Sequence, residues 1–487
     1  MMKQLIASKL LLLSLFCSVD SYAVITRLTV APAQESPTQQ LFDIQIPDTL
    51  YSPQTIEELQ KLVKKAIAGQ QKISIVGAGK SQGGQTISHQ KDACRISFDN
   101  LQRLVQLDVP GKQVTVQAGM TWKQLQKLIA PHGLAIKAMQ SYNDFSIGGS
   151  VSVNVHGQDL STGQIISTVL SMHVILANGE MVTVSRQENQ ELFGAIIGGY
   201  GLIGIIACVT LQLTDDVLVE LEADMVETAL IDKNSFEESF NEYIRNDTAI
   251  EFYSARFSVG ASDFMKKLFI VKYKKAADST AVAPVYPLQP TAKSALLKWM
   301  MRAAGAWQRF KDYRFAIEKM VLTSPETISR NNFLNYSIMG LPQSNATAEY
   351  VLQEYFLPYN QVVSFIKHFT YATQEHAINL LNVTARHVRQ DNESLLSFAP
   401  QDMCALVLFI KLPRTEIDRQ VYLRWTRQVI DDIIQHQGTY YLPYHTLATR
   451  QQFEAVYPGW QKLLEIKQQY DPDALLSNRL YEWYTSC

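Results

Sequence analysis

The amino-acid sequence predicts a fold that mixes α-helices and β-strands around a glycine-rich ligand site. Helix and strand patterns alternate between residues 55 and 136, an order typical of an α/β unit. Glycine clusters recur at residues 77–84, 148–149 and 198–204. Glycines within strands and turns mark places where the backbone comes close to a ligand or to another part of the chain. Three such places favour one long ligand, with phosphates and flat rings, over three unrelated turns.

Capping boxes mark the starts of two predicted helices in the first part of the chain. Thr55 opens the first, whose apolar residues recur at helical spacing until Gly69, and Thr121 opens the second. The dipeptide Asn178-Gly179 predicts the turn of a hairpin. The strand patterns cover residues 72–76, 96–98, 113–118, 172–176, 181–184 and 207–213.

The glycine-rich stretch 75–85 follows a short apolar strand and has four glycines in the eight positions 77–84. Successive N–H groups in such a turn form a nest that binds anions, most often a phosphate. Two standard loops do not fit, because the Walker motif needs a glycine where this chain has Ser74, and the dinucleotide fingerprint needs one at Gln82. Taken alone, the stretch leaves phosphate binding and a plain turn equally open.

The N-terminus has the features of a secretory signal peptide, which we place at residues 1–23. Two lysines precede the apolar core Leu10–Cys17, and small residues end at Ala23. This core is shorter than the roughly 20 residues that span a bilayer. Residues 24–45 are expected to form a flexible leader. The sequence therefore predicts a secreted or periplasmic protein, with an uncleaved N-terminal anchor as the alternative.

Composition limits the classes of partner and of metal site. The net charge is −2, with 44 basic and 46 acidic residues among 487, so nothing indicates nucleic-acid binding. The four cysteines beyond the signal peptide are too few for a disulfide scaffold, although one bridge is open to them. Neither Cys-x-x-Cys nor His-Glu-x-x-His spacing occurs, and no metal site is predicted.

The character of the chain changes after about residue 215. The glycine clusters stop, and residues 276–292, with three prolines, are expected to form a loop or linker. Residues 294–320 predict a basic amphipathic helix with tryptophans on its apolar side. We favour a helix that covers the substrate domain, with contact to a membrane surface as the alternative.

Taken in order, the glycine clusters resemble the FAD-binding segments of the vanillyl-alcohol oxidase superfamily, whose FAD-binding domain is of the p-cresol methylhydroxylase type. Residues 77–85 resemble the pyrophosphate loop, and Ser146–Ser152 with His156 resembles the second segment. Residues 191–206 resemble the third. The second and third segments are also similar to decaprenylphosphoryl-ribose oxidase. Residues 440–477 include two motifs that resemble the return segment of cytokinin dehydrogenases.

This resemblance implies an α+β fold. The expected parts are a two-subdomain FAD-binding domain at 46–216, an α+β substrate (cap) domain at 217–430, and a C-terminal segment, 431–487, that returns to the FAD-binding domain.

The resemblance also implies FAD as the cofactor. Relatives that bond the flavin covalently have a histidine where this chain has Lys80, so we expect non-covalent FAD, with Lys80 near the pyrophosphate. The residues expected to hold FAD are Gly77, Ala78, Gly79, Lys80, Ser81, Gln82, Gln85, Ser141, Ser146, Ile147, Gly148, Gly149, Ser152, His156, Ile206, Tyr441 and Ser477.

Candidate catalytic residues come from the second half of the chain. Arg386 lies in a segment that resembles the strand of aldonolactone and alditol oxidases whose arginine faces the flavin, and Tyr355 lies in a second segment of that kind. Cys404 falls near a substrate-side cysteine of the ribose oxidase, but a buried thiol is the simpler interpretation. The proton acceptors of relatives do not transfer intact. Tyr444 or His445 is the candidate that polarises the substrate hydroxyl.

The function implied is that of an FAD-dependent oxidoreductase. It would oxidise a hydroxyl-bearing carbon of a sugar, polyol, lactone or lipid-linked sugar by hydride transfer to flavin N5. The electron acceptor stays open. Alternatives are an amine-oxidising dehydrogenase of the cytokinin dehydrogenase type and a flavin-holding or ligand-binding protein without turnover. A reductase ranks lower, because it needs a source of nicotinamide and an exported protein lacks one.

Overall fold

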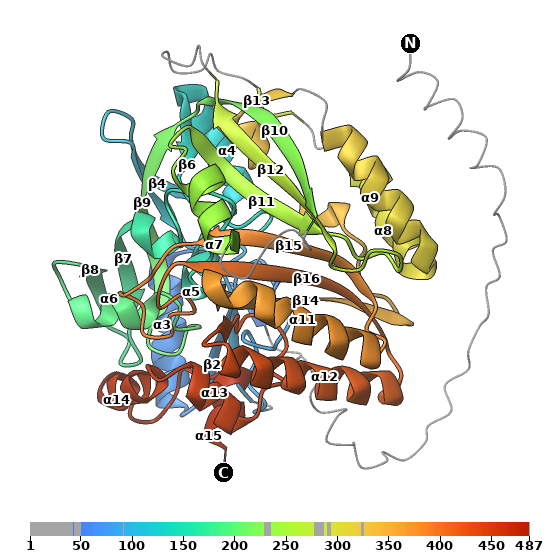
Figure 1. The fold of residues 1–487 in the computed structure, drawn as a ribbon. Helices are drawn as coiled ribbons and strands as arrows, with labels where there is room; N and C mark the ends of the chain where they lie inside the picture. Colours follow the sequence, from blue (N-terminus) through green and yellow to red (C-terminus); the bar gives the residue numbers. More distant parts are fainter. Residues whose placement is uncertain are drawn as a thin grey trace, which may run out of the picture. The chain divides into compact units, whose positions relative to one another are not determined.

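The computed structural model describes Phe42 and residues 50–90, 92–227, 235–276, 287–289, 294–322 and 326–486. The predicted signal peptide and Cys487 lie outside these residues, as do most of the predicted leader and most of the predicted linker. The described residues form helices together with a three-stranded, a six-stranded and an eight-stranded sheet (Figure 1). The predicted α+β class is confirmed.

The three-stranded sheet is parallel and has the order β1 (Leu50–Tyr51), β3 (Cys94–Ser97), β2 (Ile73–Val76). Helix α3 (Ile56–Ala68) precedes β2, and its N-cap Thr55 accepts a hydrogen bond from the Glu58 N–H, as the capping box predicts. The strands of this sheet are short, so the sheet is buried by packing against the rest of the core.

The six-stranded sheet is antiparallel and carries the predicted hairpin. Gly179 has a φ of +80° in its turn, a conformation that favours glycine. The strands are β4 (Leu104–Asp108), β5 (Gln113–Gln117), β9 (Ile205–Asp215), β7 (Val169–Ile175) and β8 (Met181–Ser185), with β6 (Leu134–Ile136) paired to β9. The helices in this part are α4 (Trp122–Ile129), α5 (Ile147–Ser152) and α6 (Gln190–Ile196).

The eight-stranded sheet is antiparallel throughout and has the order β13-β10-β12-β11-β15-β16-β14-β17. Its strands, from the first to the last in this order, are β13 (Thr327–Ser329), β10 (Leu218–Glu227), β12 (Lys267–Lys275), β11 (Ile250–Phe257), β15 (Leu380–Val388), β16 (Met403–Pro413), β14 (Ala348–Pro358) and β17 (Thr439–Tyr440).

Two long helices cover one face of this sheet, and much of the other face lines the site. Helices α11 (Tyr359–Glu375) and α12 (Glu416–Gln435) lie together along β14 and β16 (Figure 1). Because side chains alternate along a strand, every second residue of β14 points to these helices and the others point away. Further short helices among the described residues are α7 (Ser235–Phe240), α10 (Arg330–Phe333), and the helical turns Ala130–His132, Ile165–Thr168, Asn241–Arg245 and Ile338–Gly340.

The helix predicted over 294–320 is two helices, α8 (Ser294–Ala306) and α9 (Gln308–Leu322). The carbonyl of Gly305 near the end of α8 accepts hydrogen bonds from Asn379 Nδ2 and Lys411 Nζ at 3.2 and 3.3 Å. These side chains compete with continuation of the helix. Among the described residues, no helix is both long enough and apolar enough to cross a bilayer.

The C-terminal helices α13 (Arg450–Val456), α14 (Trp460–Tyr470) and α15 (Arg479–Thr485) bring the end of the chain back to the three-stranded sheet. Ile73 of β2 pairs with Leu476, and its N–H donates to the Leu475 carbonyl at 2.6 Å. The segment after α14 therefore lies beside the strand that leads into the glycine-rich loop.

Candidate active site

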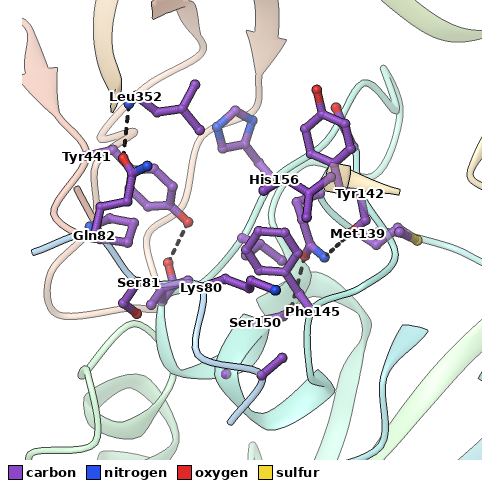
Figure 2. A pocket seen from close by; sticks show the side chains of 18 of the residues that line it. Lys80, Ser81, Gln82, Met139, Tyr142, Phe145, Ser150, His156, Leu352 and Tyr441 are labelled. Carbon is purple, nitrogen blue, oxygen red and sulfur yellow. Dashed lines mark hydrogen bonds between the residues drawn. The ribbon is translucent and has the colours of Figure 1, made fainter. Parts of the chain in front are cut away.

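One cavity of about 820 Å³ runs from the glycine-rich loop to the uncovered face of the eight-stranded sheet. Its size is that of a site for a cofactor or large ligand. The walls come from residues 77–82, from α5, from 200–206, from 441–444 and from the sheet. In Figure 2, Lys80 and Ser81 lie toward one end, and His156 and Tyr142 toward the other.

The glycine-rich loop is a cradle of backbone atoms. A Cβ at Gly77 would lie 2.1 Å from Ser146 Oγ, so only glycine lets these two walls approach. Gly79 has a φ of +64° and no heavy atom within 4 Å of where its Cβ would be. The Ala78 N–H donates to Ser146 Oγ at 3.2 Å. The loop therefore presents bare backbone to open space, which suits an anionic ligand.

A second open glycine lines the same cavity. Gly201 has a φ of +74° and again meets no heavy atom within 4 Å of an added Cβ. A Cβ at Gly148 of α5 would lie 2.6 Å from the Cβ of Ala118, so α5 sits directly on the strand end beneath it. The two bare backbone surfaces at Gly79 and Gly201 fit a long ligand that touches the protein at both.

Two glutamine amides join the loop to distant parts of the chain, Gln85 to residues 442–444 and Gln82 to β14. Gln85 Nε2 donates to the carbonyls of Leu442 at 2.6 Å and Tyr444 at 3.1 Å. Gln82 Oε1 accepts from the Leu352 N–H at 3.0 Å (Figure 2). Both glutamines line the cavity, but their amides are bonded to protein, and their role in the structure is to hold its walls together.

A polar cluster of Glu354, His156 and Tyr444 lies where the sheet faces the cavity. His156 Nε2 and Glu354 Oε1 are 2.6 Å apart, and both side chains are almost fully buried. The Tyr444 hydroxyl donates to Glu354 Oε2 at 3.3 Å. Burial, reinforced by Glu354, raises the pKa of Tyr444 well above its usual value, against the opposite effect of Arg386. Tyr444 is therefore a neutral hydrogen-bond donor.

Arg386 projects from β15 on the same face of the sheet. Its Nη2 donates to Ser141 Oγ at 2.9 Å. Its Nε is buried and has no hydrogen-bond partner among the described residues. A buried donor left in this state costs free energy unless a ligand satisfies it. Arg386 is therefore available to bind a ligand in the cavity.

Comparison with known proteins identifies the glycine-rich half of this cavity. A family model described as an FAD binding domain matches residues 47–185. Residues 47–185 form an FAD-binding domain. FAD is the cofactor, and the predicted relationship to the FAD-linked oxidase superfamily is confirmed.

Curated relatives of the FAD-binding domain are lactone oxidases. L-gulonolactone oxidase of Scyliorhinus torazame is 22% identical over 451 residues, which cover 90% of this chain and 94% of the relative. D-arabinono-1,4-lactone oxidase of Yarrowia lipolytica is 31% identical over 170 residues, 34% of this chain and 32% of the relative. L-gulonolactone oxidase of Bos taurus is 28% identical over 166 residues, 34% of this chain. The last two matches span only about a third of the relatives' length, 32% and 37%.

The cavity brings together nearly all the residues predicted to hold FAD. Ile147 is the exception, because it is fully buried on the inner side of α5 and its N–H donates to the Met120 carbonyl. Figure 2 shows the Lys80 side chain extending toward Phe145. Lining the cavity are Gly77, Ala78, Gly79, Lys80, Ser81, Gln82, Gln85, Ser141, Ser146, Gly148, Gly149, Ser152, His156, Ile206, Tyr441 and Ser477.

Of the four predicted catalytic residues, Arg386 and Tyr444 line the cavity, and Tyr355 and His445 do not. Tyr355 is fully buried on the helix-covered face of β14, with its ring 6.5 Å from that of Phe365 in α11. The prediction chose the wrong face of this strand, since Glu354 is the residue that points into the cavity. Cys404 is a buried free thiol, and burial raises its pKa to about 12.

His445 belongs to an aromatic cluster and not to the cavity. Its ring centroid lies 5.4 Å from that of Phe42 and 6.3 Å from that of Tyr422. Burial, helped by nearby arginines, lowers the pKa of His445 to about 4, so the ring is neutral at neutral pH. A neutral, enclosed imidazole outside the cavity does not serve as the substrate's proton acceptor.

The depressed pKa of His445 makes stability depend on pH. An unfolded histidine has a pKa near 6.5, so between about pH 6.5 and 4 the unfolded chain takes up a proton that the folded chain does not. The free energy of unfolding therefore falls as pH falls through this window. His445→Phe is expected to reduce that fall by about 1–3 kcal/mol, measured by urea unfolding at pH 4.5 and 7.

His387 keeps part of the pH dependence in this variant, because burial lowers its pKa to about 4 as well. The matched control is His132→Phe, at an exposed position, which is expected to leave the wild-type pH profile unchanged. A His445→Phe profile that superimposes on wild type would show that the imidazole is not buried neutral.

Sequence reasoning missed Glu354, Arg256 and Tyr142, which also line the cavity. Glu354 carried a signal, since it lies within a predicted strand among aromatic and aliphatic residues, and a carboxylate is rarely buried without a partner. Arg256 and Tyr142 carried none, because each is a single polar residue whose neighbours in space come from distant parts of the chain.

Proposed function

We propose that this chain is an FAD-dependent oxidoreductase that oxidises a hydroxyl-bearing carbon of a sugar, polyol, lactone or lipid-linked sugar. The observation that carries the proposal is the continuity of one cavity. Bare backbone suited to FAD lies at one end, and a buried carboxylate–imidazole–phenol cluster with an arginine lies at the sheet. The lactone oxidases among the relatives support a sugar-derived substrate.

The residues that would hold FAD are the glycine loop, the start of α5 with Ser146, the backbone around Gly201, and Ser477. When bound, FAD supplies the two-electron acceptor for the substrate C–H bond. Tyr441 contributes a wall fixed by the hydrogen bond of its hydroxyl to the Val153 carbonyl at 2.8 Å.

The chain's own part in the reaction is to orient the hydroxyl and to accept its proton. Glu354 is the proton acceptor that we assign, because its two oxygens already face His156 Nε2 and the Tyr444 hydroxyl. His156 is a second place at which the proton can be held. Tyr444, as a neutral phenol, donates to Glu354 and holds it in place, and Arg386 is left to bind a part of the substrate away from the reacting carbon.

We also propose how the chain is divided around the cavity. The three-stranded and six-stranded sheets would form the two subdomains of the FAD-binding domain (46–216), the eight-stranded sheet the substrate domain (217–430), and 431–487 the returning segment. With Lys80 in place of a histidine, FAD would be held without a covalent bond there. Secretion, and contact of 294–320 with a membrane, stay predictions.

Anaerobic titration of the purified, FAD-loaded protein tests the proposed function. L-gulono-1,4-lactone, D-arabinono-1,4-lactone, the parent sugars, sugar alcohols and amines are added in turn, and bleaching of the flavin band is expected with one of the oxygen compounds. Acid precipitation of the same sample is expected to leave the flavin in the supernatant.

Each contrary result has its own meaning. Bleaching only by an amine would favour the alternative dehydrogenase, and a yellow protein that no compound bleaches would favour a flavin-holding protein without turnover. Flavin that stays with the acid precipitate would contradict the non-covalent proposal alone.

A further inference from the structure

Four polar residues on strands β11 and β15 form a second polar group on the cavity face of the sheet. They are Ser254, Arg256, Thr384 and Arg386, called here the arginine quartet, and all four line the cavity. Arg256 is directly opposite Thr384 in the antiparallel pair. Because the strands are antiparallel, the same register puts Ser254, two residues before Arg256, opposite Arg386, two residues after Thr384, and on the same face.

The two arginines of the quartet are therefore diagonal neighbours. Such positions are about 7–8 Å apart in an antiparallel pair, within joint reach of two long side chains. Both guanidinium groups act on the same phenol, since each opposes the rise that burial causes in the pKa of Tyr142. The two positive charges thus face one small volume of the cavity, and the hydroxyl-bearing residues Ser254 and Thr384 line the same cavity.

The carboxylates around the quartet leave its charge only partly balanced. Glu318 Oε2 lies 3.2 Å from Arg256 Nη1, but its other oxygen lies 3.5 Å from Arg314 Nε, so one carboxylate serves two guanidiniums. Arg386 contacts the neutral Ser141 and keeps its buried Nε without a partner among the described residues. The other carboxylates of the cavity are Glu354, which is held by His156, and Glu326, which influences Tyr273.

The sheet register also fixes the distance from Arg256, the outer arginine of the quartet, to Glu354. Arg256 is opposite Thr384, Thr384 is opposite Val407, and Val407 is opposite Glu354, so these residues form one row across β11, β15, β16 and β14. Three strand spacings separate Arg256 from Glu354, about 14 Å along the sheet. A bound substrate would therefore present one end to each.

We propose that the arginine quartet binds a compact oxyanion, a carboxylate or a phosphate, carried by the substrate at the end opposite to the carbon that is oxidised. The inference rests on the proposed function for the role of the cavity as a substrate site. Paired arginines with neighbouring hydroxyl donors are a geometry that recognises carboxylate and phosphate oxygens. A neutral lactone or polyol would leave Arg256 and the Nε of Arg386 without this partner.

The test compares equilibrium binding of matched probes to the FAD-loaded protein. D-glucose, D-gluconate and D-glucose 6-phosphate share a carbon skeleton and differ in charge, and inorganic phosphate is the minimal oxyanion. Binding is followed anaerobically by the perturbation of the flavin spectrum and independently by the shift in melting temperature. Wild-type protein is expected to bind gluconate, glucose 6-phosphate or both more tightly than glucose, and the stronger of the two identifies the oxyanion.

Arg256→Gln is the deciding variant. It is expected to weaken oxyanion binding by about 10- to 100-fold, because hydrogen bonds to charged groups are lost, and to leave glucose binding nearly unchanged. Arg302→Gln, the same substitution on the exposed side of α8, is the matched control. Glu318→Gln is expected to tighten oxyanion binding, since it removes the competing carboxylate.

Three results would overturn the proposal. They are equal wild-type affinity for charged and neutral probes, wild-type oxyanion affinity in the Arg256→Gln protein, and a rise in the FAD dissociation constant of that variant, which would assign the guanidinium to the cofactor. These results are separable from failure of the proposed function. Oxyanion binding without bleaching by any compound would refute turnover and support the anion site. Bleaching by a neutral substrate, at the same rate in wild type and in Arg256→Gln, would support turnover and refute the anion site.

Discussion

Glu354→Gln is expected to slow reduction of the bound FAD by substrate about 10²- to 10⁴-fold, the range that a positioned general base contributes. Glutamine keeps the shape of the side chain and its contacts with His156 and Tyr444, but it accepts no proton at neutral pH. The measurement is the rate of flavin bleaching in an anaerobic stopped-flow instrument with the best compound of the titration. The pH dependence of that rate is expected to change with it.

A loss of rate has to be separated from a loss of fold or cofactor. The visible spectrum and melting temperature of Glu354→Gln should therefore match wild type, and Glu393→Gln, which breaks the exposed ion pair with Arg186, is the carboxylate control. The rate of flavin bleaching in Tyr444→Phe is expected to lie between those of wild type and Glu354→Gln, because this variant loses one hydrogen bond to Glu354 but keeps the carboxylate base. A Glu354→Gln protein that bleaches at the wild-type rate would exclude this carboxylate as the proton acceptor.

Asp471→Ala is expected to lower the free energy of unfolding by about 3–5 kcal/mol, the cost of leaving one charge of a buried pair without its partner. Asp471 Oδ2 lies 2.7 Å from Lys467 Nζ, and both side chains are almost completely enclosed. The carboxylate also accepts from the N–H groups of Leu475 and Leu476. Burial lowers the pKa of Lys467, and Asp471 opposes that effect.

Urea unfolding measures this change, with Glu465→Ala as the control. Glu465 and Lys462 form an exposed pair on the same helix α14, so its removal should leave the unfolding curve unmoved. The double variant Lys467→Met, Asp471→Leu is expected to recover part of the lost stability, because apolar side chains need no counter-charge. An Asp471→Ala midpoint equal to that of wild type would mean that water reaches this pair.

The sequence predicted the FAD half of the cavity well, because glycine is read locally. Gly79 and Gly201 have left-handed backbone, which no other residue type adopts so readily. A glycine at each of these positions is therefore a signal that the sequence alone provides. The α3 helix was predictable for the same reason, since its cap and its apolar spacing lie within a few residues of each other.

The substrate half could not be predicted as fully, because its geometry depends on contacts between distant residues. Strand β14 is buried on both faces and has polar residues on each, so alternation alone did not tell whether Glu354 or Tyr355 faces the cavity. The α11 and α12 helices decide it, and they are placed by tertiary packing. Arg256 becomes part of a site only through the pairing of β11 with β15, more than 100 residues later in the chain.

The bonds from Gln85 to the carbonyls of Leu442 and Tyr444 have a consequence for the order of assembly. A Cβ at Gly83 would lie 2.0 Å from the Tyr444 oxygen, so loop and segment fit directly against each other. A ribosome that has released residues 77–85 has still to synthesise more than 350 residues before this partner exists. The cofactor loop therefore takes its final shape only after synthesis is nearly complete, and FAD is expected to enter a full-length chain and not a nascent one.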